Sequence, residues 1–232
     1  MTQRRDFIRK ASLLAAGSLA AGAVEAQSAA LSGKAGAAGT TGLRPAAAPW
    51  DMSWVDRVTG KYRMAFDAPE ISEGAALHQV RAFLAGYNTV YGTTDADLSA
   101  VLVIRHKAVP MVLGDALWAD GAFAGDEKLQ DPETGEPAKR NPFTNVPAGA
   151  RFALTWPDGA LDRLLARGVI VLACDMALNG LTGRIAGRKG ISREDAAALV
   201  AQHLIPGVIR MPTGIFATCR AQAAGCGVMY AV

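Results

Sequence analysis

The stretch L-S-A-V-L-V-I (98–104) is the strongest structural signal in the chain, because it is apolar at every position except Ser99. A strand without polar alternation is covered on both faces, as is typical of the inner strands of a parallel sheet. Other strand-like runs lie on either side of it along the chain, at 61–66, 169–173, 208–211 and 227–232. The sequence therefore predicts about five strands.

Amphipathic helical patterns separate these strands. Leu77, Val80 and Leu84 recur at intervals of three and four, which defines one face of a helix. Further helices are expected after Pro110, near 161–165, through 177–185, from Ser192 and over 213–224. Strands alternating with helices predict an α/β domain with a mostly parallel sheet and helices on both faces. In such a sheet the ligand crevice lies beyond the carboxyl ends of the strands.

Residues 125–150 interrupt this rhythm. They are rich in Asp, Glu, Lys, Pro and Asn, a composition that predicts a long surface excursion. Loops of this length inside a compact domain are usually functional or disordered. The sequence leaves open whether this insertion covers the crevice or extends an interface.

The N-terminal region has the pattern of a bacterial export signal. Arg4 and Arg5 adjoin, a weakly apolar run follows over 11–23, and residues 24–26 offer a small-residue cleavage site. Paired arginines indicate the twin-arginine route, which carries folded proteins to the periplasm. About 13 Ala- and Gly-rich residues are too few for an anchor across a core of roughly 30 Å. We expect 1–26 to be a signal peptide, 27–49 a flexible Ala/Gly/Pro linker and 50–232 a single domain.

Charge excludes one class of partner. The leader holds four of the 24 Lys and Arg and two of the 21 Asp and Glu, which leaves 20 basic and 19 acidic residues. Without a basic stripe, nucleic acid is not an expected partner. No other apolar run reaches 18 residues, so we expect no stable membrane insertion.

Three cysteines remain, Cys174, Cys219 and Cys226. An odd number leaves at least one thiol unpaired in an oxidising compartment. A bridge between Cys219 and Cys226 is disfavoured, because one falls within a helix and the other begins a strand. No C-x-x-C pair is present to indicate a redox or zinc motif.

Several chemically useful side chains fall at the expected strand ends. Cys174 follows the third strand, and His106 follows the second. The crevice would also contain Asp67, Arg105 and Thr213. A histidine and a cysteine at the ends of separate strands could approach each other. His78, His203, Asp115 and Trp118 are expected to be structural.

Four segments resemble the DsrE/DsrF-like family, in particular its exported branch. They are V-L-V-I-R-H-K-A-V-P-M-V-L-G-D-A-L-W (101–118), D-P-E-T-G-E-P-A-K-R-N-P-F (131–143), G-V-I-V-L-A-C-D-M-A-L (168–178) and P-G-V-I-R-M-P-T-G-I-F-A-T-C-R-A-Q-A-A-G-C-G-V-M-Y (206–230). The third segment places Cys174 where sulfur-carrying relatives have their acceptor cysteine. The resemblance implies a flavodoxin-like sheet, assembly into trimers or hexamers, and persulfide transfer between proteins. Relatives that act on cytoplasmic tRNA differ from this chain, whose leader directs it outside.

Two functions from different classes remain open, together with a purely structural subunit. In the first, Cys174 carries sulfane sulfur as a persulfide, His106 tunes it, and a donor or acceptor protein is the partner. Such a protein is at most a sulfurtransferase-like carrier. In the second, the crevice around His106 binds a small anion, through Arg105, or a soft metal such as zinc or copper. The amides at the start of the following helix favour a thiolate at Cys174, whereas the neighbouring Asp175 opposes it.

Overall fold

Five parallel strands form one sheet. The computed structural model describes residues 50–119, 122–131, 134–147, 149–150 and 158–232, all within the compact unit Pro45–Val232. The expected leader (1–26) and linker (27–49) lie outside the described residues. The strands are β1 (Tyr62–Ala68), β2 (Leu98–Ile104), β3 (Ile170–Cys174), β4 (Ile209–Met211) and β5 (Gly227–Tyr230), in the order β4-β3-β2-β1-β5. The predicted parallel sheet is confirmed.

Strand β2 lies at the centre of the sheet, as its unbroken apolar sequence predicts. All seven of its residues are buried, and it pairs with β1 along its full length, from Tyr62↔Leu98 to Ala68↔Ile104. Fully burying a residue such as Leu102 stabilises the fold by about 1.5–3 kcal/mol.

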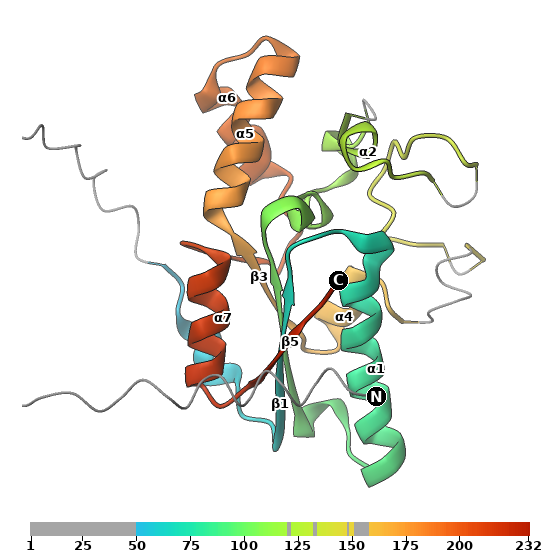
Figure 1. Cartoon of the computed structure of the whole chain (residues 1–232), viewed down its shortest axis with the longest axis vertical. Helices are drawn as coiled ribbons and strands as arrows, with labels where there is room; N and C mark the ends of the chain where they lie inside the picture. Colours follow the sequence, from blue (N-terminus) through green and yellow to red (C-terminus); the bar gives the residue numbers. More distant parts are fainter. Residues whose placement is uncertain (1–49, 120–121, 132–133, 148, 151–157) are drawn as a thin grey trace, which may run out of the picture. The chain divides into compact units, whose positions relative to one another are not determined.

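Helices cover both faces of the sheet, which gives a flavodoxin-like α/β arrangement (Figure 1). Helices α1 (Ala75–Tyr91), α4 (Leu161–Ala166) and α5 (Asp175–Lys189) pack on one face, and α6 (Arg193–Gln202) packs against α5. Helix α7 (Gly214–Ala223) and the 3-10 helix η2 (Ser53–Arg57) cover the other face. The fully buried Trp54 of η2 joins the core beneath α7.

The strand order creates a topological switch between β3 and β4. The chain advances through β1, β2, β3 and β4 in one direction and then returns across the sheet to place β5 beside β1. Right-handed crossovers therefore put α7 on the face opposite α5. The chain leaves the carboxyl ends of β3 and β4 toward opposite faces, and ligand crevices in open α/β sheets form at such points.

The segment after β2 differs from the sequence prediction. No α-helix begins at Pro110; the proline lies inside a 3-10 helix, η5 (His106–Val112), and a second short one, η6 (Asp115–Leu117), follows. A short α-helix, α2 (Ala122–Glu127), comes next, and a further 3-10 helix, η4 (Asp95–Asp97), precedes β2. Proline cannot donate the hydrogen bond that a continuing α-helix would need.

The insertion is not a plain surface excursion, which corrects the sequence prediction. Asn141 is 0% exposed and Phe143 is 3% exposed. The Asn141 side-chain amide donates to the carbonyl oxygens of Met111 (2.8 Å) and Leu113 (2.9 Å). These bonds satisfy carbonyl groups that the irregular segment leaves without partners, so they hold the insertion against the core.

Among the described helices, none has the length and apolar character needed to cross a bilayer.

Candidate functional site

The carboxyl edge of the sheet contains a paired arginine and aspartate from adjacent strands. Arg105 follows β2, and its Nε and Nη2 donate to Oδ1 (2.6 Å) and Oδ2 (2.9 Å) of Asp67 in β1. This bidentate hydrogen bond is the main reason why the pKa of Arg105 lies above its ordinary value. Burial acts in the opposite direction and lowers this pKa. Smaller coulombic contributions from Tyr230 and Cys174 act in the same direction as the hydrogen bond. Arg105 therefore lies within electrostatic range of the predicted acceptor thiol.

The start of α7 packs directly on Arg105. A Cβ atom added to Gly214 would lie 2.5 Å from Cβ and 2.6 Å from Cδ of Arg105. The hydroxyl oxygen of Thr213 accepts from the Phe216 amide at 3.0 Å and so caps this helix. The predicted ligand residue Thr213 thus has a structural task, and its helix N-terminus faces the same edge.

Cys174 ends β3 and occupies the N-cap position of α5. It is 6% exposed and is a free thiol. The amide of Met176, the second residue of α5, donates to the Pro212 carbonyl at 3.3 Å, which joins this helix to the connection after β4. Cys174 therefore lies at the switch point, where the connections after β3 and β4 diverge.

The carboxylate of Asp175, next to Cys174, is paired with an arginine. Asp175 is 7% exposed and forms a close ion pair with Arg210 of β4. The Arg210 Nε donates to Oδ1 at 2.9 Å, and Asn179 Nδ2 donates to Oδ2 at 2.7 Å. The expected opposition of Asp175 to a Cys174 thiolate is thus offset by the Arg210 charge.

His106 lies at the same edge but faces outward. Its backbone has a φ of 52°, its side chain is 60% exposed, and its Nδ1 is 3.4 Å from Oε1 of Glu70. Within the described residues, no hydrogen bond joins His106 to Cys174. The structure thus brings Asp67, Arg105 and Cys174 together, and the role of His106 stays a prediction.

The described residues contain no group of three or more His, Cys, Asp or Glu side chains placed to hold a metal ion. Both arginines near the crevice already bind carboxylates: Arg105 binds Asp67, and Arg210 binds Asp175.

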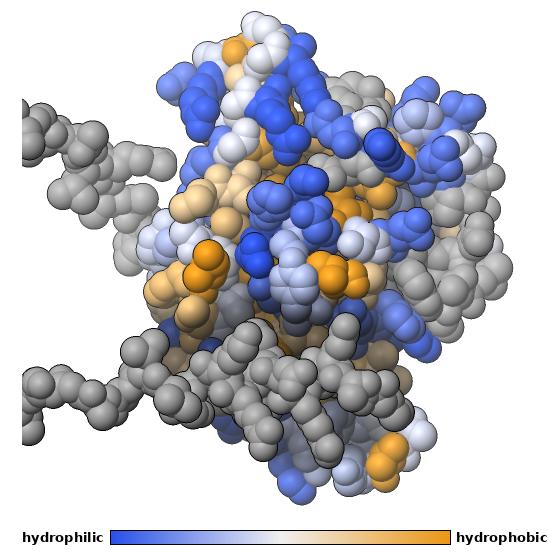
Figure 2. Space-filling view, in the orientation of Figure 1, coloured by the Kyte–Doolittle hydropathy of each residue, from blue (hydrophilic) through white to orange (hydrophobic). Residues whose placement is uncertain are grey.

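Exposed apolar side chains surround this edge. Met176 is 65% exposed at the start of α5, Ile215 is 68% exposed at the start of α7, and Tyr230 is 60% exposed at the end of β5. Figure 2 shows hydrophilic residues over this end of the sheet, with apolar residues on either side of them. Exposed apolar groups around a polar centre are typical of surfaces that contact another molecule.

The other two cysteines differ from Cys174 in their surroundings. Cys219 is exposed on α7, whereas Cys226 is buried just before β5. Burial raises the pKa of Cys226, and Arg63 opposes this in part. All three thiols are free, in agreement with the disfavoured bridge.

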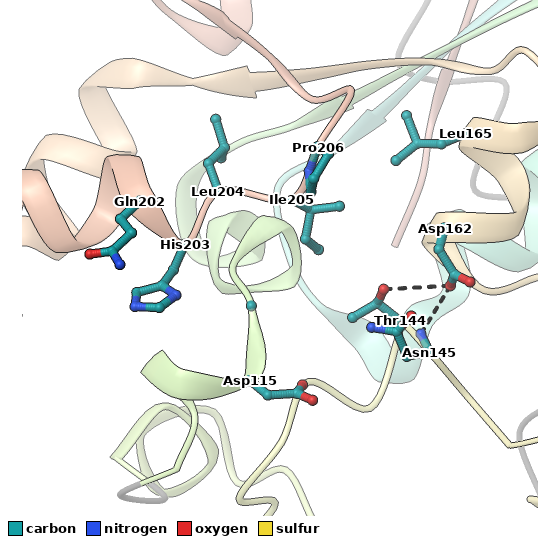
Figure 3. Close-up of a pocket in the computed structure, with 11 residues that line it drawn as sticks. Asp115, Thr144, Asn145, Asp162, Leu165, Gln202, His203, Leu204, Ile205 and Pro206 are labelled. Atoms are coloured by element: carbon teal, nitrogen blue, oxygen red, sulfur yellow. Dashed lines mark hydrogen bonds between the residues drawn. The ribbon is translucent and has the colours of Figure 1, made fainter.

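A cavity of about 480 Å³, which the sequence does not predict, lies at a different place (Figure 3). Asp115 and His203, both expected to be structural, line it together with Asp162 of α4. None of the predicted crevice residues lines it. Its walls come from four separate segments, so no local sequence pattern could have revealed it.

No family model and no curated protein matches the chain. Among solved structures, a protein of unknown function from Methanobacterium thermoautotrophicum, MTH1491, overlaps with 73% of this chain and 98% of its own. The two share 15% identity, and the TM-score is 0.38. A likeness this weak bears on neither the fold nor the function.

Proposed function

We propose that the protein is an exported, DsrE-like carrier of sulfane sulfur that holds the sulfur on Cys174. The observation that carries the proposal is the position of this free thiol at the switch point, at the N-terminus of α5 and within electrostatic range of Arg105. The amides at the N-terminus of α5 favour the thiolate, which is the form that attacks sulfur.

The proposed step is a transfer of one sulfur atom. The Cys174 thiolate attacks the outer sulfur of a donor persulfide, R–S–SH. A bond forms between Sγ and that sulfur as the S–S bond of the donor breaks. The donor leaves as the thiolate R–S⁻, so no separate oxidant or reductant is needed. Return of the sulfur to an acceptor thiolate follows the same step in reverse.

Three features of the edge support this chemistry. The Asp175 charge is compensated by Arg210, so it opposes the thiolate less than the sequence indicates. The 6% exposure of Cys174 favours a slender donor group and protects a persulfide from water and oxidants. The exposed Met176, Ile215 and Tyr230 would contact a donor or acceptor protein.

The test is the intact mass of the purified protein before and after incubation with a sulfane-sulfur donor, and again after reductant. We expect a reversible gain of about 32 Da, the mass of one persulfide sulfur, that maps to Cys174. Cys174→Ser should abolish the gain, and the matched Cys219→Ser should retain it. An unchanged mass in the parent protein, or an equal gain in Cys174→Ser, would overturn the proposal.

The alternative, a small-anion or soft-metal module around His106, has weaker support. The imidazole faces Glu70 and solvent, and the nearby guanidinium groups already bind carboxylates. Elemental analysis of the same preparation decides: one equivalent of zinc or copper that is lost in His106→Ala would favour the alternative.

We further propose that the carrier acts in the periplasm and assembles into a homo-oligomer. The paired Arg4 and Arg5 support export, and the resemblance supports assembly. Fractionation of cells that express the parent or an Arg4→Lys, Arg5→Lys variant tests the first point. Light scattering on the purified protein tests the second.

A further inference from the structure

The cavity of about 480 Å³ lies apart from Cys174 and has a composition of its own. It is lined by residues at the start of η6, in the insertion, in α4, and from the end of α6 into the connection before β4: Gly114, Asp115, Thr144, Asn145, Asp162, Leu165, Gln202, His203, Leu204, Ile205 and Pro206. In Figure 3, Asp115 lies below the cavity, Asp162 to its right and Ile205 above it. Cavities of roughly 300–1,000 Å³ are the usual size of small-molecule sites.

Main-chain hydrogen bonds hold the walls of this cavity in place. The Gly114 amide donates to the His203 carbonyl at 2.7 Å, and the Ile205 amide donates to the Val112 carbonyl at 2.9 Å. Leu113 and Leu204 form an isolated antiparallel bridge between these contacts. The connection after α6 is thereby fixed against the end of η5, so the cavity is formed before any ligand binds.

Two carboxylates are oriented at the cavity by the insertion. Oδ1 of Asp115 accepts from the Asn141 amide at 2.9 Å, and Oδ1 of Asp162 accepts from the Asn145 amide at 3.0 Å. Each main-chain bond occupies one oxygen of its carboxylate. In the part of the chain that the structure describes, Oδ2 of each has no protein hydrogen-bond partner.

No described lysine or arginine balances these two charges. Arg163 follows Asp162 on α4, but its Nη1 lies 3.8 Å from Oδ1 of Asp158 instead. The buried Thr144, 4% exposed, lines the cavity between the carboxylates, and its hydroxyl reaches Asp162 only at 3.5 Å. That distance is the outer limit of a hydrogen bond, so the hydroxyl can also serve a ligand.

One side of the lining is apolar. This apolar wall is formed by Leu165, Leu204, Ile205 and Pro206. A bare ion in the cavity would leave these side chains in contact with water. The described residues also provide no group of three ligands for a metal. A ligand that satisfies both parts of the cavity carries a positive charge at one end and an apolar body at the other.

We propose that this cavity binds a small organic cation: an amine whose ammonium group donates hydrogen bonds to Oδ2 of Asp115 and Asp162. Its apolar body packs against Leu165 and Ile205, and the Gln202 and His203 side chains are available to polar substituents. The site is separate from Cys174, and it stands whether or not that residue carries sulfur.

The test is isothermal titration calorimetry of the full chain with three amine probes, namely phenethylamine, cyclohexylamine and cadaverine. 2-Phenylethanol serves as the neutral counterpart of the first probe. We expect saturable binding of at least one amine, weakened by added salt because the attraction is electrostatic, and no binding of the alcohol. Failure of all three amines, or equal binding of the alcohol, would overturn the proposal.

Two variants localise the site. Asp162→Asn keeps the acceptor for the Asn145 amide but removes the charge, and it should weaken amine binding about tenfold or more, whereas Asp56→Asn on the exposed part of η2 should not. Leu165→Trp should fill the cavity and abolish binding, with circular dichroism to verify its fold. Unchanged affinity in Asp162→Asn and in Leu165→Trp would place the amine elsewhere and refute the inference.

Discussion

Gly214 is the residue on which the geometry of the carboxyl edge depends. Any side chain there would meet Cβ of Arg105 at 2.5 Å, and that atom is attached to the backbone, so it cannot rotate away. The close approach lets α7 cover the Arg105–Asp67 pair and keeps the arginine beside Cys174.

We therefore predict that Gly214→Ala lowers the free energy of unfolding by about 1–3 kcal/mol, the usual cost of forcing an extra methyl group into a packed site. Urea unfolding of the purified protein measures the change. Gly180→Ala in α5 is the matched control, because a Cβ atom there meets nothing within 4 Å. It should be neutral or stabilising by up to about 1 kcal/mol. Equal behaviour of the two variants would contradict the packing described for Gly214.

The three cysteines are expected to react with iodoacetamide in a defined order. Cys219 is exposed and should be modified first. Cys226 should be modified last at neutral pH, because burial raises its pKa and keeps it in the unreactive thiol form. Peptide mapping of the native protein over time measures the order. Modification of Cys226 as fast as Cys219 would show that this residue is more open than the structure has it.

At the scale of elements, one side chain fixes the insertion to the core. Asn141 donates to two carbonyl groups of the segment after β2, and its own Oδ1 accepts from the Phe143 amide at 2.9 Å. Its main-chain amide orients Asp115. The insertion and the cavity therefore depend on the same residue.

Asn141→Ala should lower the free energy of unfolding by about 3 kcal/mol, because it leaves the carbonyls of Met111 and Leu113 buried without their donors. Thermal and urea unfolding measure the loss. Gln130→Ala, an exposed amide in the same insertion, should change the value by less than about 0.5 kcal/mol. A loss as small as that of Gln130→Ala would mean that the insertion is held by other contacts.

An ion pair between two elements predicts that the stability of the fold depends on pH. Nε and Nη2 of Arg167, after α4, donate to Oδ2 (2.8 Å) and Oδ1 (3.0 Å) of Asp95, just before β2. These bonds lower the pKa of Asp95 below 3.8, with help from Asn88 and against the effect of burial. The stabilisation is therefore complete above the pKa of the carboxyl group in the unfolded chain, which is near 4. It is lost as the pH falls through the lower pKa of this group in the folded protein.

Asp95→Asn should thus lower the free energy of unfolding by about 1 kcal/mol at pH 7, as expected for a partly exposed ion pair. The difference from the parent protein should shrink as the pH falls below about 4, where the parent loses the same charge. Urea unfolding at a series of pH values measures this. A difference that stays constant down to the acid limit would show that the ion pair contributes nothing.

At the scale of the whole molecule, the sheet can be predicted well from the sequence, because each strand and helix is indicated by residues that lie close together in the chain. The apolar run 98–104 indicates an inner strand, and the helical spacing of Leu77, Val80 and Leu84 indicates α1. The strand ends then follow, so Asp67, Arg105 and Cys174 could be placed at one edge in advance.

Features that depend on contacts between distant segments could not be predicted in this way. The pairing of Arg105 with Asp67 rather than with a ligand requires the register of β1 and β2. The burial of Asn141 depends on unpaired carbonyls some 30 positions earlier in the sequence. The cavity requires residues from four segments, and His203 and Asp115 carry no signal of it individually.

The pairing of β5 with β1 has a consequence for the order in which the sheet forms. β5 completes the sheet beside β1, and the Ala231 amide donates to the Asp67 carbonyl at 2.8 Å. β1 becomes an inner strand only when the segment that forms β5 has crossed back over the sheet. Because this pairing joins segments far apart in the sequence, we expect it to form late in folding. Asp67 would then reach its final surroundings only in that last step.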